Sequence, residues 1–515
     1  MSDRSHNHTL DRNTEIGALS DKVRRAVDRI ILFLSVAIAV ESAILFLNDR
    51  PGAVAFMLMG IGTCVALKAW CGGAIGLPLL PMMAVQSLVI YGVPIAVGHT
   101  VILSYPKAFV SSAGVEVLVF DLAMILAWKL GMQAFQPSQA VSYALQDLRG
   151  GGSKGWSRLG FGMVIAATTF DVLQSLTITD SLYAALPSGA SSILAAMVSV
   201  VSACGFFLVS MAIGGREASS VGRVAFWALL VVNGMMSASE FLLYSAAANL
   251  ITVAIGFFWS SGKIPWRYLT VSMLCLSFLN TGKTTMRDRH WSNDDYEPAA
   301  PATFGQLPSL YAEWIGVSYD AFLEDPDSRN SGNTIQANKG QSLLDRIDNL
   351  QNLLFVIDAV DTEHVKLLNG ATYTLIPPLL VPRILWPNKP RSHEGQIILN
   401  VHFGRQDLNS TFSTYIAWGL LPEAYGNFGP IAGAIAIGGF LGLCFSWIEN
   451  FTARKIVLSM EGFLSLSLLM NLMNSFEMVA SVLVTSIFQS FVIVVIASAP
   501  FARRTVTKKP QPDRN

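Results

Sequence analysis

The sequence predicts an all-α membrane protein, built as a bundle of about twelve spanning helices with one large loop domain. Hydrophobic residues make up 52% of the 515 residues and charged residues only 14%, whereas a soluble globular chain carries roughly 25% charge. The apolar residues lie in runs long enough to cross a bilayer core of roughly 30 Å. One segment, 281–428, departs from this pattern and is far longer than an ordinary connection. The formal net charge is zero, which excludes a chain-wide attraction to nucleic acid.

The chain opens with 29 polar residues that carry Arg24 and Arg25 just before the first apolar run, 30–47. That run lacks a small-residue cleavage site, so it indicates a first span behind a cytoplasmic tail and not a removed signal peptide. Glu240 and Glu477 mark hairpins between spans that follow one another almost directly. The expected spans are approximately 30–47, 53–70, 74–97, 112–131, 159–179, 190–213, 223–239, 241–260, 267–280, 429–448, 457–476 and 478–500.

The distribution of Lys and Arg predicts the orientation, because cytoplasmic loops are enriched in these residues. With the N-terminus inside, the inner loops carry most of the basic residues, and the C-terminal tail is basic too. Both termini are therefore expected in the cytoplasm of a bacterial cell, with a multi-pass chain in its inner membrane and segment 281–428 in the periplasm. The expected organisation is a tail (1–29), about nine spans (30–280), the periplasmic loop with the active site (281–428), about three spans (429–500) and a basic tail (501–515).

Two amphipathic helices are predicted inside the loop. Apolar residues recur every three or four positions from Leu343 to Ile357, and a similar pattern covers Leu307–Leu323. Between the helix predicted over 343–357 and the next span lies a stiff proline-rich segment, Pro382 to Pro390. Its three prolines fix φ and restrict the residues before them, so an extended path without regular hydrogen bonds is expected there.

Basic residues gather at both ends of the loop. Lys283 and Arg287 follow a span end, while Arg383, Lys389 and Arg391 lie on or beside the proline-rich segment. Arginine and lysine are the residues that bind phosphate and diphosphate groups, arginine through paired hydrogen bonds. We expect these five cations to hold a diphosphate, although cations at a membrane surface are also often solvated or in contact with lipid headgroups.

Candidates for proton transfer and for sugar contacts lie nearby. His393, Glu394 and Glu423 are candidate catalytic residues together with Arg383, because a His or carboxylate can take a proton from a sugar hydroxyl. Glu423 would equally well cap the following helix. Trp386 and Tyr425 are candidates for stacking on sugar rings, and the alternative for each is the interfacial aromatic belt. No nucleotide-binding glycine motif and no convincing metal-ligand spacing is present, so neither a metal nor another cofactor is predicted.

Four stretches of the sequence carry a family resemblance, the third being the most specific: Leu279-Asn280-Thr281-Gly282-Lys283-Thr284-Thr285-Met286-Arg287, Arg346-Ile347-Asp348-Asn349-Leu350, Pro382-Arg383-Ile384-Leu385-Trp386-Pro387-Asn388-Lys389-Pro390 and Glu423-Ala424-Tyr425-Gly426-Asn427-Phe428-Gly429. Together they resemble the O-antigen polymerase family, the Wzy-type oligosaccharide repeat-unit polymerases. The resemblance is strongest over about 280–430. The N-terminal half matches in hydropathy alone.

The resemblance implies a GT-C-like helical architecture and a glycosyltransferase activity. Such enzymes move a glycan from an undecaprenyl-diphosphate carrier onto another lipid-linked repeat unit, with no nucleotide sugar. It also implies diphosphate-binding and leaving-group-stabilising roles for Lys283, Arg287, Arg383 and Lys389. Expected partners are the lipid-linked oligosaccharide, membrane lipids, a chain-length regulator and a flippase, and no nucleic acid.

Two other functions fit part of the pattern. A transporter or flippase of lipid-linked oligosaccharide would be expected to show two similar halves and functional charges deep in its spans, whereas the unusual residues here lie in one asymmetric loop. A ligase that joins the glycan to another acceptor would need almost the same site. The sequence alone separates this ligase poorly from a polymerase that makes O-antigen, capsule or exopolysaccharide.

Overall fold

A computed structural model of the chain describes residues 21–135, 141–145, 153–290, 302–323, 348–453, 478–498 and 502–506, and scattered positions between 462 and 472. The gaps within these ranges are 177, 180–189, 216–217, 242, 262, 264, 383–384, 387, 392 and 413–415. The described chain is helical apart from a pair of short strands, β1 (Val141–Leu145) and β2 (Ala502–Val506), which form a two-stranded sheet. The predicted helical class is thus confirmed.

Seven helices among the described residues are long and apolar enough to cross a membrane, as expected of a multi-pass membrane protein. They are Val27–Leu47, Ala53–Gly73, Leu79–Ala96, Lys107–Ala134, Met197–Gly214, Ser220–Ala238 and Ala432–Thr452. Two further apolar helices are shorter, Ala246–Phe257 and Ala480–Ile496. Most of the expected span 457–476 lies outside the described residues. A total of about twelve spans stays a prediction.

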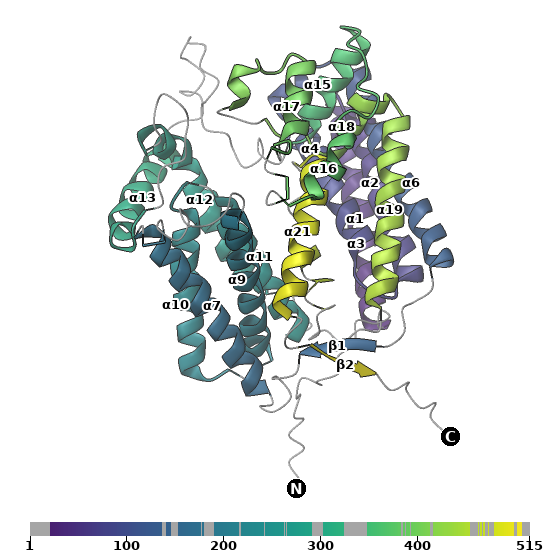
Figure 1. The fold of residues 1–515 in the computed structure, drawn as a ribbon. Helices are drawn as coiled ribbons and strands as arrows, with labels where there is room; N and C mark the ends of the chain where they lie inside the picture. Colours follow the sequence, from purple (N-terminus) through teal and green to yellow (C-terminus); the bar gives the residue numbers. More distant parts are fainter. Residues whose placement is uncertain are drawn as a thin grey trace, which may run out of the picture. The chain divides into compact units, whose positions relative to one another are not determined.

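The chain divides into two compact units, and one of the boundaries between them falls inside segment 281–428. One unit contains the helices within Leu145–Leu343; the other combines Asn13–Ala144 with Leu344–Asn515. The helices of the first unit are α7 (Ser153–Ser175), α9 (Ala190–Gly214), α10 (Ser220–Ala238), α11 (Leu243–Ser261), α12 (Trp266–His290), the 3₁₀ turn η3 (Phe304–Gln306) and α13 (Leu307–Leu323) (Figure 1). The bounds of α13 confirm the helix expected over Leu307–Leu323.

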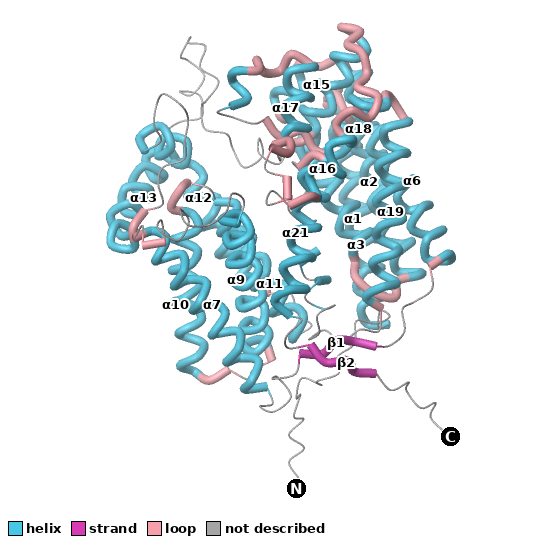
Figure 2. The backbone as a smooth tube through the Cα atoms, viewed as in Figure 1, coloured by secondary structure: helices cyan, strands magenta, loops and turns pink. Residues whose placement is uncertain are grey.

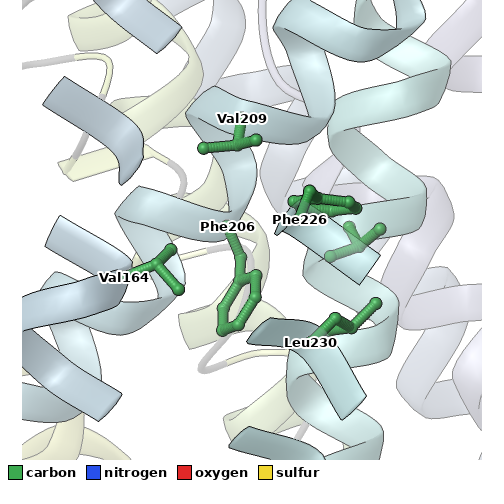
Figure 3. Packing of buried hydrophobic residues seen from close by; sticks show 6 residues of the cluster. Val164, Phe206, Val209, Phe226 and Leu230 are labelled. Atoms are coloured by element: carbon green, nitrogen blue, oxygen red, sulfur yellow. The ribbon is translucent and has the colours of Figure 1, made fainter. Parts of the chain in front are cut away.

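Two apolar clusters hold the first unit together. In one, Phe206 of α9 and Phe226 of α10 meet edge to face at 6.1 Å, with Val164 and Val253 packed beside them (Figure 3). In the other, Trp314 of α13 is fully buried and donates its indole N–H to the carbonyl of Leu279 at 2.8 Å. Burial of such large rings contributes most of the packing energy of a cluster, so α13 is fixed to α12 of the same unit.

The second unit begins with the long helices α1 (Asp21–Leu47), α2 (Ala53–Gly73) and α6 (Lys107–Ala134), to which α19 (Ala432–Thr452) and α21 (Ala480–Ser498) are added from the other end of the chain (Figure 1). Between α2 and α6 lie α3 (Leu79–Ser87), a π-turn η1 (Leu88–Gly92), α4 (Val93–Ala96) and α5 (Thr100–Leu103). Helices α2 and α19 pack on α6.

The approach of α19 to α6 is unusually close, because glycines leave room for backbone. A Cβ at Gly438 would lie 2.4 Å from the carbonyl oxygen of Phe120, and one at Gly442 would lie 2.2 Å from that of Met124. The two glycines are four residues apart, the small-residue spacing by which membrane helices pack tightly. The α6–α19 pair therefore depends on the absence of two side chains.

Two buried carboxylates tie this helix pair to its neighbours. At one end, Glu116 of α6 accepts the N–H of Ile431 at 2.8 Å, just before α19 begins. At the other end, Glu449 of α19 accepts the N–H groups of Ile75 (2.8 Å) and Gly76 (3.1 Å) and the indole N–H of Trp128 (2.9 Å). Backbone N–H groups inside a membrane protein need such partners, because an unsatisfied one costs several kcal/mol.

The second half of the long segment is packed onto the same end of α19 as Glu116. It contains α15 (Leu350–Asp361), η5 (Tyr373–Leu375), α16 (Ile376–Leu380), α17 (Glu394–His402), η6 (Asn409–Phe412) and α18 (Leu420–Phe428). Figure 2 shows loop backbone interleaved with these short helices. Of the helix expected over 343–357, the structure describes α15 from Leu350 on, and residues 343–347 lie outside the described residues. Just before α15, Oδ1 of Asp348 accepts the N–H of Gln351 at 3.1 Å.

Candidate functional site

The proline-rich segment is closed by its own lysine. Lys389 donates through Nζ to the carbonyl of Leu379 at 2.8 Å and to that of Val381 at 2.7 Å. Both carbonyls lie at the end of α16, where helix carbonyls lack intrahelical partners and carry partial negative charge. The ammonium predicted to bind diphosphate therefore ties the C-terminal part of the proline-rich segment to the residues just before its start.

The backbone of this segment turns, and the expected extended path without regular hydrogen bonds is wrong for the described residues. The carbonyl of Pro382 accepts the N–H of Leu385 at 2.9 Å and that of Trp386 at 3.1 Å. Proline lacks a donor but keeps an accepting carbonyl, so it can open a turn. Arg383, the predicted catalytic and diphosphate-binding residue, lies outside the described residues.

Trp386 is accessible at the tip of this turn. It exposes 43% of its surface, and its neighbour Leu385 exposes more. An exposed indole on a fixed backbone offers a flat apolar face, which suits stacking on a sugar ring. The predicted stacking role of Trp386 stays a prediction.

Arg391, His393 and Glu394 surround the start of α17. Arg391 and Glu394 form an ion pair at 3.0 Å between Nε and Oε2. His393 lies with Nδ1 2.8 Å from Oε1 of Gln396. Partly exposed ion pairs of this kind contribute at most about 1 kcal/mol to stability. Arg391 and Glu394 can therefore give up their mutual contact and bind a charged group of a substrate instead, at low cost.

Glu423 of α18 is fully buried, with 0% exposure. Its Oε1 accepts the hydroxyl of Thr372 at 2.7 Å and its Oε2 accepts the N–H of Ala480, the first residue of α21, at 2.6 Å. Burial raises the pKa of Glu423 to about 7, and the two hydrogen bonds lower it by less. The carboxyl thus joins α18 to η5 and α21, and it does not cap the helix that follows it.

Unpaired polar atoms surround this carboxyl. Within the described residues, the hydroxyl of Tyr373, Oδ1 of Asn427 and the hydroxyl of Ser481 are buried without a hydrogen-bond partner. Asn427 donates to the hydroxyl oxygen of Thr372 at 2.9 Å, so it belongs to the same cluster as Glu423. Burial, followed by the nearby Glu423 charge, raises the pKa of Tyr373. Polar groups left unsatisfied inside a protein are costly and gather at functional sites.

Tyr425 exposes only 1% of its surface on α18. Burial is the main cause that raises the pKa of its hydroxyl. Its ring fills the interior, so in this structure no face is presented for the predicted stacking on sugar.

Lys283 and Arg287 lie on α12, in the other unit. Lys283 is 5% exposed, and Arg287 donates through Nη2 to the carbonyl of Phe241 at 3.0 Å. The cations expected to converge from both ends of the loop thus belong to two different units. Their convergence on one diphosphate stays a prediction.

Sequence reasoning missed a buried amide network that fixes the segment. Nδ2 of Asn352 donates to Oδ1 of Asn349 at 2.6 Å and to the carbonyls of Ala417 (3.0 Å) and Trp418 (3.2 Å). The indole of Trp418 donates in turn to Oδ1 of Asn400 at 2.6 Å. The available signal was two Asn residues within otherwise apolar helices, because a buried amide there needs partners.

Arg405 completes this network with a half-buried guanidinium. It donates through Nη1 to Oδ1 of Asn352 at 2.6 Å and lies over the ring of Phe355, 5.3 Å from its centroid. Burial lowers its pKa, and the nearby Tyr105 raises it by less. Arg405 forms no ion pair with any carboxylate in the part of the chain that the structure describes. A guanidinium held by neutral groups keeps its charge available for an anion.

Searches of protein families, of curated proteins and of solved structures find no match to this chain.

Proposed function

We propose that the chain is a membrane glycosyltransferase that joins lipid-linked oligosaccharide repeat units into a polysaccharide, as its likeness to O-antigen polymerases implies. The hydroxyl oxygen of an acceptor sugar attacks the anomeric carbon of the donor glycan. The bond from that carbon to undecaprenyl diphosphate breaks, a glycosidic bond forms, and the hydroxyl proton passes to a base. The configuration at the anomeric carbon inverts in this single step.

The observation that carries the proposal is the closed turn between Leu379 and Lys389. Its backbone is held by two bonds from one ammonium, and it presents an exposed Trp386 in the stretch of sequence that also contains Arg383 and Arg391. A preorganised turn loses little freedom when it binds a substrate. An aromatic face for the sugar next to cations for the diphosphate is the chemistry that a lipid-diphosphate-linked glycan needs.

We assign the charges of this region separate roles. Arg383 stabilises the negative charge that develops on the departing diphosphate, and Arg405 is a further cation available to the same group. Glu423 is the base candidate whose pKa of about 7 best suits proton transfer near neutral pH.

The test replaces Arg383 with alanine. The matched control is Lys366→Ala, because Lys366 is an exposed cation of the same long segment, 281–428. Each full-length variant complements a strain that lacks the chromosomal gene, at equal membrane abundance, and the surface glycan is sized on gels. The control makes long chains. The Arg383→Ala variant leaves single repeat units, with a loss of chain extension of at least about a hundredfold if one transition-state contact is removed.

The location of the stalled glycan separates the competing functions. Repeat units that accumulate on the outer leaflet, or are capped singly onto the acceptor, indicate a polymerase. Units that remain on the cytoplasmic leaflet indicate a flippase and overturn the proposal. Long chains of normal abundance in Arg383→Ala remove Arg383 from the reaction.

A further inference from the structure

A large open cavity lies at the opposite end of the second unit from the proline-rich segment. Its volume is about 730 Å³, and it is formed where α2, α6 and α19 end. Lys68 and Gly72 of α2, Trp128, Lys129 and Met132 of α6, and Asn450 of α19 are among the residues that line it. The wall is therefore mainly apolar, with two lysines and two amides, Gln133 and Asn450.

Charge around the cavity is positive on balance. Lys129 is exposed and forms no ion pair within the described residues, and Lys68 pairs with Asp28 at 2.8 Å. The Lys68–Asp28 pair is exposed and screened by solvent, so a phosphate can displace it.

The buried carboxylate of Glu449 forms no salt bridge with Lys68 or Lys129 in the described part of the chain. It accepts three N–H groups, from Ile75, Gly76 and Trp128. These bonds place Ile75 and Trp128, which both line the cavity. The floor is thus a fixed surface and not a gap between mobile side chains.

Two features show that the cavity has room and an unsatisfied polar group. A Cβ at Gly72 would meet no atom within 4 Å, so the glycine faces open space. Oδ1 of Asn450 is buried and has no hydrogen-bond partner among the described residues, although its amide nitrogen is bonded to the carbonyl of Ser446 at 2.9 Å. A ligand with a hydroxyl donor would satisfy that oxygen.

The position of the cavity selects the kind of ligand. Three apolar helices of membrane-spanning length end there, which places it where hydrocarbon meets headgroups. Basic pockets between membrane helices at this level bind anionic headgroups, while the apolar wall suits acyl chains. The α19 helix of 21 residues is about 30 Å long, so the site is remote from Glu423 and its neighbours.

We propose that this cavity binds an anionic phospholipid, with its phosphate at Lys68 and Lys129 and a headgroup hydroxyl at Asn450. The inference is independent of the glycan reaction. Phosphatidylglycerol, which carries a phosphate and free hydroxyls, is the probe whose chemistry matches the lining.

The test uses the full-length protein in detergent micelles, with lipid retention measured by native mass spectrometry. The parent protein retains one phosphatidylglycerol in preference to phosphatidylcholine. Lys129→Gln weakens retention about fivefold, the value expected for one lysine near a membrane surface. Gly72→Leu fills the cavity and removes retention, whereas Gly439→Leu, a matched helix glycine whose Cβ would also meet nothing within 4 Å, leaves it unchanged.

Two results would overturn the inference. One is equal retention of phosphatidylglycerol by the parent, Lys129→Gln and Gly72→Leu proteins, all shown to be monodisperse by size exclusion. The other is displacement of the lipid by millimolar inorganic phosphate, which would reduce the site to an anion site without a lipid. The Lys129→Gln variant keeps the test valid even where Gly72→Leu lowers expression.

Discussion

Glu423 illustrates how one side chain can hold three segments together and still respond to pH. It accepts hydrogen bonds from Thr372 and Ala480, residues that lie 51 and 57 positions away in the chain. Its carboxyl is removed from water, which penalises the charged form. The same burial that fixes α18, η5 and α21 therefore makes their junction sensitive to protonation.

The replacement Glu423→Gln tests this sensitivity. The folded-state pKa of about 7 lies above the ordinary value of 4.5, so the native state binds the proton more tightly than the unfolded state does. The stability contributed by Glu423 is thus fully present below pH 4.5 and is lost as the pH rises to about 7, a change of about 3 kcal/mol. Glutamine resembles the protonated acid, so the variant should lose this part of the pH dependence.

The measurement is thermal unfolding in detergent micelles between pH 5 and 8, for the parent protein and the variant. As the pH rises, the melting temperature of the parent protein should fall relative to that of the Glu423→Gln variant. An unchanged slope of stability against pH in Glu423→Gln would show that Glu423 titrates at its ordinary value.

At the scale of elements, the α6–α19 pair depends on glycine more than on large side chains. Gly438 and Gly442 place the α19 backbone against carbonyl oxygens of α6, and van der Waals contact between backbones is the main source of attraction between membrane helices. Gly439 lies beside them in sequence but faces no atom within 4 Å. Neighbouring glycines in one helix therefore have different roles.

Valine substitutions separate the two roles. Gly442→Val would force its Cβ to within 2.2 Å of the Met124 carbonyl oxygen, so the helices must separate, at a cost of about 1–3 kcal/mol. Gly439→Val should leave stability nearly unchanged. The melting temperature of each purified full-length variant gives the comparison, and equal values would mean that the close contact contributes little.

Hydrophobic periodicity and charged residues between apolar runs correctly predicted helices and hairpins whose formation depends on nearby residues. The apolar face containing Leu350, Leu354 and Ile357 is fully buried as expected, and the hairpin at Glu240 separates α10 from α11. The amide network was not predictable, because Asn352 bonds to groups 53 and 65 residues away. Likewise, the closure of the proline-rich turn by Lys389 depends on where two carbonyls point, which residue spacing does not encode.

At the scale of the whole molecule, the second unit has two ends with different chemistry. The turn with Leu385 lies at the end where α19 begins, and the cavity with Lys129 lies where α19 finishes. The distribution of basic residues predicts that the cavity end faces the cytoplasm. The two positions are therefore expected on opposite sides of the membrane.

Cysteine labelling in cells with a permeabilised outer membrane checks this arrangement. A membrane-impermeant maleimide should react with the Leu385→Cys variant directly, and with the Lys129→Cys variant only after the inner membrane is opened. The parent chain with its native cysteines measures background labelling. Reaction of both variants from the outside would invalidate the orientation.

The close contact of α19 with α6 also has a consequence for the order of synthesis. The second unit is made of two stretches of chain separated by the first unit, and α6 ends roughly 300 residues before α19 begins, a gap of some tens of seconds at ordinary translation rates. During that interval the first unit can be completed, while the face of α6 that the α19 glycines later contact waits in the membrane without its partner. The earliest helices to be made are thus among the last to reach their final packing.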